Sequence, residues 1–250
     1  MKFRVVIVGL VSLIGSGLNA QDKPAAQKGD PRAADLMEQA AKSRYTWSQD
    51  FAAVSGKFTW NIDGKSGAGT FHYKLRQKGG PTFTADGGTE IPADVKEHIA
   101  SMIFHRVPPA AGAARRPQPS YVIVIEDEDR GPLIMTVGDK MHSTQRIKDG
   151  RMVQVNRLME GKRFTIDVRE FEKSPDGRCY PATFTVTYWD ADSGKMVENQ
   201  VHTTEGIELI SGQMFPKAEK VVTRKEGSST LQIQYSDIKF EMAGPGGDAK

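Results

Sequence analysis

The five histidines of this chain have the side chains best suited to metal binding or proton transfer, so their spacing is the first test for chemistry. His98 and His105 fall in one predicted helix, seven residues and about 10.5 Å apart along its axis, which is too far for both to reach one metal ion at about 2 Å. His72, His142 and His202 fall in predicted strands and have no carboxylate or cysteine partner at motif spacing. Unless the tertiary structure brings them together, we interpret all five as packed or surface histidines and predict no metal site.

Two acidic segments have the composition of calcium-binding loops but not their pattern. Glu126–Asp129 precedes Gly131-Pro132 in a predicted turn, where a run of charge is usually solvated. Asp190–Gly194 lacks the third ligand of an EF-hand loop, and Val201 stands where that loop needs a glutamate. We therefore predict no metal and no cofactor.

Nucleophilic catalysis has no recognisable signature in the chain. There is no Gly-x-Ser-x-Gly segment, and Gly67-Ala68-Gly69 lies inside a predicted hairpin rather than between a strand and a helix, where a phosphate-binding loop would stand. Cys179, the one cysteine, is interpreted as a small apolar residue entering a strand. We assign no catalytic residue. An enzyme is the less favoured interpretation, because it would need carboxylates, or His105 and an acid, to converge in space.

Residues 1–20 have the pattern of a secretory signal peptide. Lys2 and Arg4 are followed by an apolar stretch, Val5–Ile14, and then by small residues up to Ala20, where cleavage is expected. The apolar stretch is about half as long as the roughly 20 residues that a membrane-spanning helix needs. The sequence therefore predicts an exported protein, periplasmic or extracellular, that is soluble after cleavage and has no membrane span in its mature chain.

The charge balance argues against nucleic acid as a partner. The full chain has 34 basic and 31 acidic residues, and loss of Lys2 and Arg4 with the signal peptide leaves 32 against 31, a net charge of +1. A nearly neutral protein has no general attraction for polyanions. Because a single cysteine excludes an internal disulfide, the exported chain must be stabilised by its hydrophobic core, for which about 210 residues are enough.

Polar segments frame one predicted β-rich domain, residues 30–242. Residues 21–29 are expected to form a flexible leader and residues 243–250 a disordered tail. The Pro-rich stretch at 108–119 is expected to be an exposed loop within the domain, because proline interrupts both helix and sheet.

Two helices are predicted, both in the first half of the chain. The first has Asp30 as its N-cap and Pro31 at its first position, and it is expected to run to about Tyr45. The second begins at Pro92 and ends near Arg106. Its apolar face is formed by Val95, Ile99, Met102 and Ile103.

Strand signals fill the rest of the domain. Apolar and polar residues alternate from Phe51 onward and again between Met141 and Thr203, where turns such as Asp149-Gly150 separate the runs. The segment Gly206–Phe215 breaks the pattern, so we expect no strand there. With ten or so strands, the predicted fold class is α+β and mostly β: a large curved antiparallel sheet, or half-barrel, that wraps a central helix, plus an N-terminal helix.

A curved sheet around one helix can enclose an apolar cavity for a ligand. We expect its lining to come from aromatic and aliphatic side chains of the early strands, the second helix and the later meander. These are Trp47, Trp60, Phe71, Ile99, Ile103, Phe184, Tyr188 and Trp189. Packing in a filled core is the alternative explanation for the same residues.

Four motifs together resemble an exported bacterial family described only as a domain of unknown function. They are Arg44-Tyr45-Thr46-Trp47, Ile103-Phe104-His105-Arg106, Gln154-Val155-Asn156-Arg157, and the FTVTYWD segment at 184–190 that leads to Ser193-Gly194-Lys195. The similarity covers most of residues 32–242, with a long insert at 108–119, and it implies no activity, ligand or catalytic residue. The order of helix, strands, helix and meander is also similar to the half-barrel of LolA- and LolB-like periplasmic lipoprotein carriers, which implies a curved sheet with an apolar hollow.

Three functions follow as hypotheses. The first is non-enzymatic binding of an apolar or lipid-like ligand in the cavity of the curved sheet. The alternative is a structural or protein–protein interaction module of the cell envelope with a filled core, for which Arg115-Arg116 in the Pro-rich loop would be a contact site. The third is a hydrolase whose site is assembled only in the tertiary structure. The expected partners are a lipid or apolar small molecule or an envelope protein, and not nucleic acid.

Overall fold

The computed structural model describes residues 29–75, 80–109, 119–159 and 161–243 of the chain. The predicted signal peptide, the leader up to residue 28, the tail from residue 244 and most of the Pro-rich loop, with Arg115-Arg116, lie outside the described residues. No helix in these described ranges has the length and apolar character needed to cross a bilayer.

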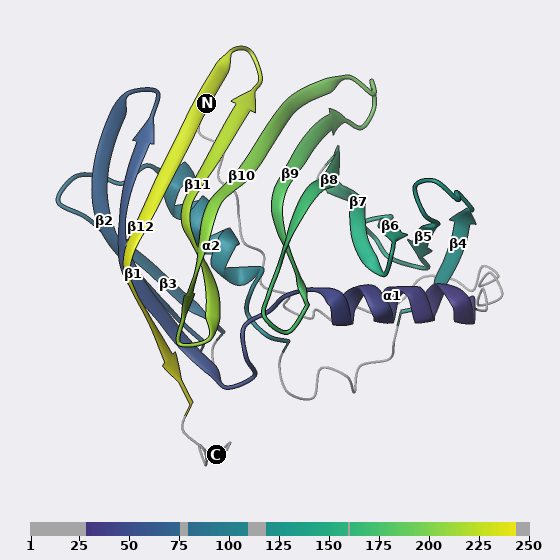
Figure 1. Ribbon diagram of the computed structural model, residues 1–250. Coiled ribbons are helices and arrows are strands. Elements are labelled where there is room, and N and C mark those ends of the chain that lie inside the picture. Colours follow the sequence, from purple (N-terminus) through teal and green to yellow (C-terminus); the bar gives the residue numbers. More distant parts are fainter. Residues whose placement is uncertain (1–28, 76–79, 110–118, 160, 244–250) are drawn as a thin grey trace, which may run out of the picture.

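The described residues form two helices and twelve strands (Figure 1). The helices are α1 (Pro31–Ser43) and α2 (Ala93–Phe104). The first strands are β1 (Phe51–Ile62), β2 (Lys65–Lys74) and β3 (Thr82–Asp86), and α2 is followed by β4 (Tyr121–Ile125), β5 (Leu133–Thr136), β6 (Thr144–Lys148) and β7 (Arg151–Met159). The chain ends with β8 (Lys162–Lys173), β9 (Cys179–Asp190), β10 (Met196–Ile210), β11 (Gln213–Arg224) and β12 (Ser228–Met242).

All twelve strands belong to one sheet, in the order β3-β2-β1-β12-β11-β10-β9-β8-β7-β6-β5-β4. Neighbouring strands are antiparallel throughout, so hairpins suffice for all pairs except β1 with β12, which join the two ends of the domain. The sheet bends around α2 and stays open, with β3 and β4 at its edges (Figure 1). The predicted fold class, a mostly β half-barrel around a central helix with an additional N-terminal helix, is confirmed.

Two-residue turns set the register of the hairpins. Both residues of each turn have positive φ, as the twist of a tight hairpin requires. The φ values are 49° and 88° for Asp63-Gly64, and 51° and 67° for Asp149-Gly150. The predicted break at Gly206–Phe215 is wrong. The strand β10 passes through Gly206, which takes a φ of 76° without a change of register, and the chain turns only at Ser211-Gly212, where both φ values are positive.

The helix α2 packs against the concave face of the β1–β2–β12–β11 end of the sheet and forms the main core. Its predicted apolar face, Val95, Ile99, Met102 and Ile103, is buried. The facing side chains are large and mostly aromatic, and they include Phe58, Phe71, Phe215 and Ile233. Burial of such side chains is the dominant stabilising contribution in a chain without disulfides.

The helix α1 covers the other end of the same face. Asp30 is its N-cap, as predicted, and its carboxylate accepts from the Arg32 N–H at 2.8 Å. The small side chains Ala33 and Ala40 pack against Ile134 and Ile147 in a second core. The helix ends at Ser43, slightly before the predicted end, because the next residues adopt an extended conformation and the N–H of Tyr45 donates to Cys179.

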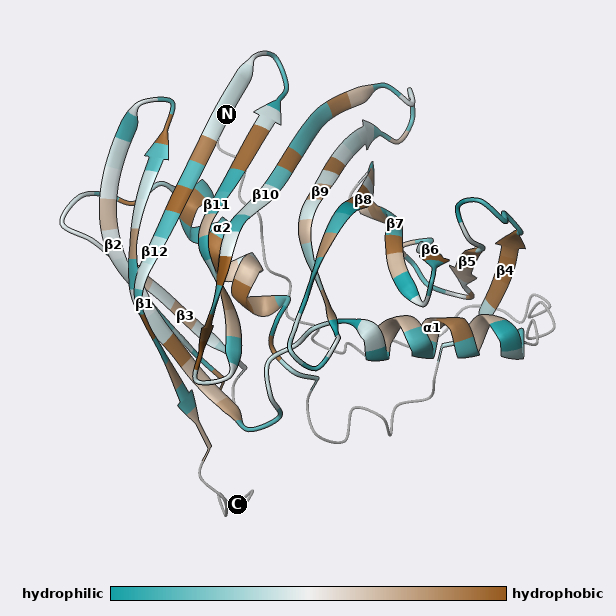
Figure 2. Ribbon diagram, in the orientation of Figure 1, coloured by the Kyte–Doolittle hydropathy of each residue, from teal (hydrophilic) through white to brown (hydrophobic). Residues whose placement is uncertain are grey.

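The convex face of the middle strands is polar. Asn156 donates to Thr144 Oγ1 at 3.0 Å and accepts from Thr165 Oγ1 at 2.8 Å, and Asn199 donates to Thr187 Oγ1 at 2.9 Å. Alternation along each strand therefore places the apolar neighbours of these residues on the concave side, which the alternating hydropathy of β8, β9 and β10 in Figure 2 reflects.

Two glycines with positive φ allow the cost of a steric clash to be measured apart from the cost of backbone strain. A Cβ on Gly131 (φ 83°) would lie 1.9 Å from the Ile147 carbonyl oxygen, whereas a Cβ on Gly138 (φ 73°) would meet no atom within 4 Å. We expect Gly131→Ala to lower the free energy of unfolding by roughly 3 kcal/mol or more. The matched change Gly138→Ala should cost only about 1–2 kcal/mol. Urea unfolding measures both, and equal losses would contradict this packing at the β5–β6 end of the sheet.

Candidate functional site

The concave face continues between the two helices, across β7 to β10. The His202 ring on β10 stacks on Phe184 of β9 at 4.5 Å and lies 5.8 Å from the ring of His98 on α2. These residues therefore lie on the face that α2 covers. Farther along the same face, Phe164 pairs with both Tyr188 and Arg157 of the neighbouring strands.

Apolar side chains form a continuous row on this middle part of the face, which we call the concave row. Its members alternate along β8 and β9 and are Phe164, Ile166, Val168, Phe184, Val186 and Tyr188. Most of them are only partly buried, whereas α2 side chains such as Ile99 and Ile103 are 0% exposed. Among the described residues, α1 packs on β4, β6 and β7, and α2 on the β1–β2–β12–β11 end. The concave row thus lies between the helices with solvent access.

The structure divides the predicted cavity-lining residues into three groups. Trp47, Trp60, Phe71, Ile99 and Ile103 belong to the main core and are at most 8% exposed. Phe184 and Tyr188 belong to the concave row. Trp189 is next to Tyr188 on β9, so it lies on the convex face, where it pairs with Arg163 and Met196.

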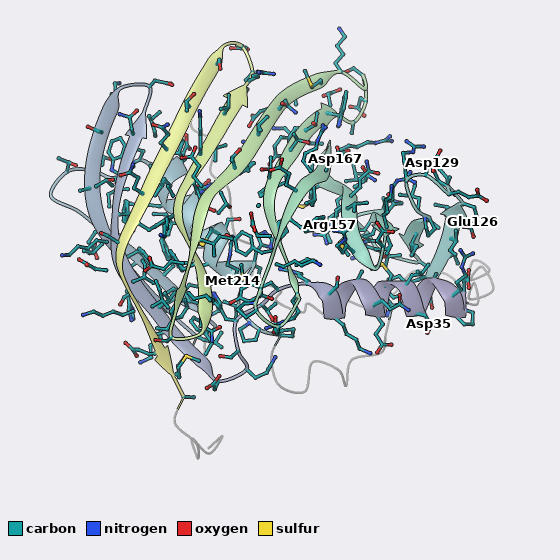
Figure 3. All side chains as sticks on the ribbon, in the orientation of Figure 1. Asp35, Glu126, Asp129, Arg157, Asp167 and Met214 are labelled. Atoms are coloured by element: carbon teal, nitrogen blue, oxygen red, sulfur yellow. The ribbon has the colours of Figure 1, made fainter. Side chains whose placement is uncertain are left out.

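Three of the four sequence motifs meet at the C-terminal end of α2. A guanidinium N–H of Arg44 donates to the carbonyl of His105, and the N–H of Trp47 donates to the carbonyl of Arg106 at 2.8 Å. Arg157, which Figure 3 labels, lies on the concave face of β7 opposite Phe164, and its charge acts on His105 at the end of α2. The motif around 184–190 supplies half of the concave row. The motifs therefore bring basic and apolar side chains to one surface.

The basic residues of these motifs form what we call the arginine cluster: Arg44, Arg106 and Arg157. Arg106 donates to the Met102 carbonyl and to the Tyr180 hydroxyl, and its guanidinium lies 4.3 Å from the centre of the Tyr180 ring. Burial, followed by the positive charges of all three arginines, lowers the pKa of His105 to about 4. His105 is therefore neutral at physiological pH.

A buried polar cluster holds the other side of α2 to the sheet. Glu219 of β11 contacts His98 Nε2 at 3.0 Å and accepts from the Tyr235 hydroxyl at 2.8 Å. Burial by itself would raise the pKa of Glu219, but His98, Arg106 and Tyr235 together lower it to about 2. His202, beside His98, has its pKa lowered to about 4 by burial and then by His98. The cluster thus contains an ionised carboxylate inside an aromatic core.

The predicted positions of two histidines need correction. His142 lies in a turn with a φ of 47° rather than in a strand, because the chain reverses there between β5 and β6, and His105 caps α2 rather than lying within it. No three His, Cys, Asp or Glu side chains in the described ranges are grouped so as to hold a metal ion. A separate open groove of about 570 Å³ lies near β1, β2 and β3, but small residues such as Gly69 and Gly87 make up much of its lining.

Sequence reasoning missed Glu219 and the arginine cluster. The partner of His98 is 121 residues away, so no motif spacing connects them. A signal for Glu219 was present, because alternation places it on the same face as the apolar Val221 and therefore inside. The three arginines were each within a recognised motif, but only the tertiary structure shows that these motifs meet.

Comparisons with known proteins identify a family and several weak structural likenesses. The sequence model of the family described as Protein of unknown function (DUF3386) matches residues 28–240, which confirms the predicted relationship to a family of unknown function. No curated protein matches the chain significantly.

Among solved structures, a DUF1329 family protein from Desulfovibrio piger is 11% identical with a TM-score of 0.34, and the match covers 88% of this chain and 96% of that protein. A LolA superfamily protein from Nitrosomonas europaea is 12% identical with a TM-score of 0.34, and the match covers 84% of this chain and 93% of that protein. Likenesses this weak carry no conclusion about function.

The buried carboxylate predicts a defined dependence of stability on pH. The pKa of Glu219 in the folded protein, about 2, is below its ordinary value of 4.5. Ionised Glu219 therefore adds to stability above pH 4.5, and this contribution is lost as the pH falls from 4.5 toward 2. Glu219→Gln should lower the free energy of unfolding by about 3 kcal/mol at pH 7, and the gap from wild type should narrow below pH 4.5.

Urea unfolding at pH 7, 4.5 and 3 measures this gap. Glu226→Gln, in the exposed turn between β11 and β12, is the matched control and should show no gap at any pH. A Glu219→Gln gap that stays constant down to pH 3 would contradict a buried, ionised carboxylate.

Proposed function

This chain belongs to the DUF3386 family of proteins of unknown function, and we propose that it is a non-enzymatic domain that binds an apolar or lipid-like ligand along the concave row. The observation that carries the proposal is the partial burial of this row. Phe164, Phe184 and Tyr188 face the interior of the half-barrel, yet neither helix fully covers them. Apolar surface left accessible inside a concavity is characteristic of ligand sites.

The main core supports this assignment by its contrast with the concave row. Five of the predicted cavity-lining residues, including Trp47 and Ile103, are almost fully buried in the main core beside α2. An apolar ligand would instead lie against the middle strands, with α2 and α1 on either side. Binding would remove the exposed part of the row from water, at about 25 cal/mol per Å² of apolar surface.

The cellular location is part of the same proposal. The pattern of residues 1–20 supports export to the periplasm or the extracellular space, followed by cleavage that leaves a soluble mature protein. A carrier or sensor of an apolar molecule would be useful in that location, because such a molecule does not cross water unaided.

Adjacent residues on opposite faces of β8 give a direct test of the binding surface. Phe164 belongs to the concave row, and Arg163 is exposed on the convex face. We expect Phe164→Asn to weaken binding of a fluorescent fatty acid at least tenfold, because the change removes an aromatic contact and adds a polar amide. Arg163→Asn should leave the affinity unchanged. If wild-type protein takes up no fatty acid, and native mass spectrometry shows only the apo mass, apolar binding is rejected.

A protein-binding role is the second candidate, and the edge of the sheet supports it. The strand β4 is a terminal strand and is strongly hydrophobic (Figure 2), with Val124 44% and Ile125 48% exposed. An accessible apolar edge can accept a strand from another protein. This role predicts that Ile125→Lys abolishes capture of an envelope protein in a pull-down, whereas Leu209→Lys, at an equally exposed site on β10, does not. The same partners with both variants would exclude the edge as the contact.

A further inference from the structure

The arginine cluster has more positive charge than the described protein neutralises. No carboxylate of the described residues lies within 4 Å of Arg44, Arg106 or Arg157, although eight other arginine and lysine side chains have such partners. Arg178 offers a comparison, because it contacts Thr46, two residues from Arg44, and is ion-paired with Asp176 at 2.7 Å. The cluster is distinguished by its density, because three guanidinium groups without a described carboxylate partner all act on one side chain, His105.

The donors of these arginines are also incompletely used. A guanidinium has five N–H donors, yet that of Arg157 makes no hydrogen bond in the described structure, and its Nε is buried. The Nε of Arg106 is likewise buried without a partner, and Arg44 donates once, to His105. Leaving buried donors unpaired is costly. The terminal nitrogens of Arg157 are also unpaired but are not buried, so they are the donors that an acceptor from outside the chain can reach.

Two acidic groups that these arginines influence are bound by other residues. Asp139 is influenced by the charge of Arg157, but its carboxylate accepts from the backbone N–H groups of Met141 and Ser143. Glu219 is influenced by Arg106, but it is bound by His98 and Tyr235. Neutral His105 adds a hydrogen-bonding ring among the arginines without adding a further positive charge.

Arg157 connects the cluster to the concave row. It lies on the concave face of β7 and pairs with Phe164, the row's nearest member on β8. A group held by Arg157 would therefore keep any attached hydrocarbon chain in contact with the row. Arg44 and Arg106 approach the same space from the ends of α1 and α2.

We propose that the arginine cluster binds the anionic head group, a carboxylate or phosphate, of an amphiphile whose hydrocarbon chain lies on the concave row. This inference rests on the proposed function and names the chemical class of its ligand. Arginine suits the role because its planar donors match both oxyanions in a two-point contact. The ligand is thus an anionic lipid rather than a neutral apolar molecule.

The test compares ligands that differ only in their head group. Heptadecanoate, hexadecyl phosphate and hexadecan-1-ol have the same C16 alkyl chain, so isothermal titration with each isolates the head-group contribution. We expect wild-type protein to bind heptadecanoate or hexadecyl phosphate at least tenfold more tightly than the alcohol, with a preference that falls as salt rises. Inorganic phosphate alone should bind at least a hundredfold more weakly than hexadecyl phosphate, because it lacks the chain.

Substitutions at Arg157 locate the site. Arg157→Gln should abolish the preference for the anionic ligands and leave binding of the alcohol unchanged, and Arg157→Lys should restore part of the preference. Arg151→Gln removes the same charge from the same strand at a position ion-paired with Asp149, and it should change nothing. Should Arg157→Gln fold poorly, Arg44→Gln provides the same comparison at the rim of the cluster.

The possible outcomes separate the two proposals. The anionic site is rejected, while apolar binding stands, if wild-type protein binds all three ligands equally. The same conclusion follows if Arg157→Gln and Arg44→Gln both keep the preference for the anionic ligands. If inorganic phosphate binds as tightly as hexadecyl phosphate, the cluster is a site for free anions and the amphiphile is rejected. If none of the three ligands binds, the proposed apolar binding is rejected, and the anionic site is rejected with it.

Discussion

The extended segment 44–47 holds the parts of this molecule in place. The N–H of Tyr45 donates to Cys179 on β9, and that of Trp47 donates to Arg106 at the end of α2. Both side chains also bond to the backbone of Met214 on β11, which Figure 3 labels below α2: the Tyr45 hydroxyl accepts at 2.7 Å and the Trp47 indole donates at 3.2 Å. Four buried hydrogen bonds thus join α1 to α2 and to the sheet. The span between the helices, where the concave row lies, depends on this connection.

An open half-barrel must cover its concave face, and this one does so unevenly. Aromatic packing fills the α2 end, small alanines allow α1 to approach the β4–β7 end closely, and neither of these helices fully covers the middle strands. The convex face of these strands is polar, and cross-strand hydrogen bonds between Asn and Thr side chains stabilise it. The same alternation that makes the outside polar leaves the inside apolar and accessible.

Charge inside the half-barrel is distributed in two unlike ways. On one side of α2, Glu219 is compensated by His98 and Tyr235, so the helix is fixed to β11 and β12 by satisfied polar contacts. At the end of α2, the arginine cluster has no compensating carboxylate within the described residues, and its neighbour His105 is held neutral. The first arrangement explains how a helix is positioned. The second leaves an electrostatic requirement that a bound anion would meet.

The elements and the fold class could be predicted from the order of residues, because these depend on local periodicity and turn chemistry. The cap at Asp30, the buried face of α2 and the turn at Asp149-Gly150 all follow from residues close together in the chain. Gly206 misled the strand prediction because a glycine in an unusual conformation can lie inside a continuous strand. The folded chain was needed to show which aromatic residues are core and which line the concave face, to pair His98 with Glu219, and to place the charge of Arg157 near His105. Those relationships arise from sheet curvature and from residues far apart in the chain, 121 positions for His98 and Glu219, which no spacing in the sequence encodes.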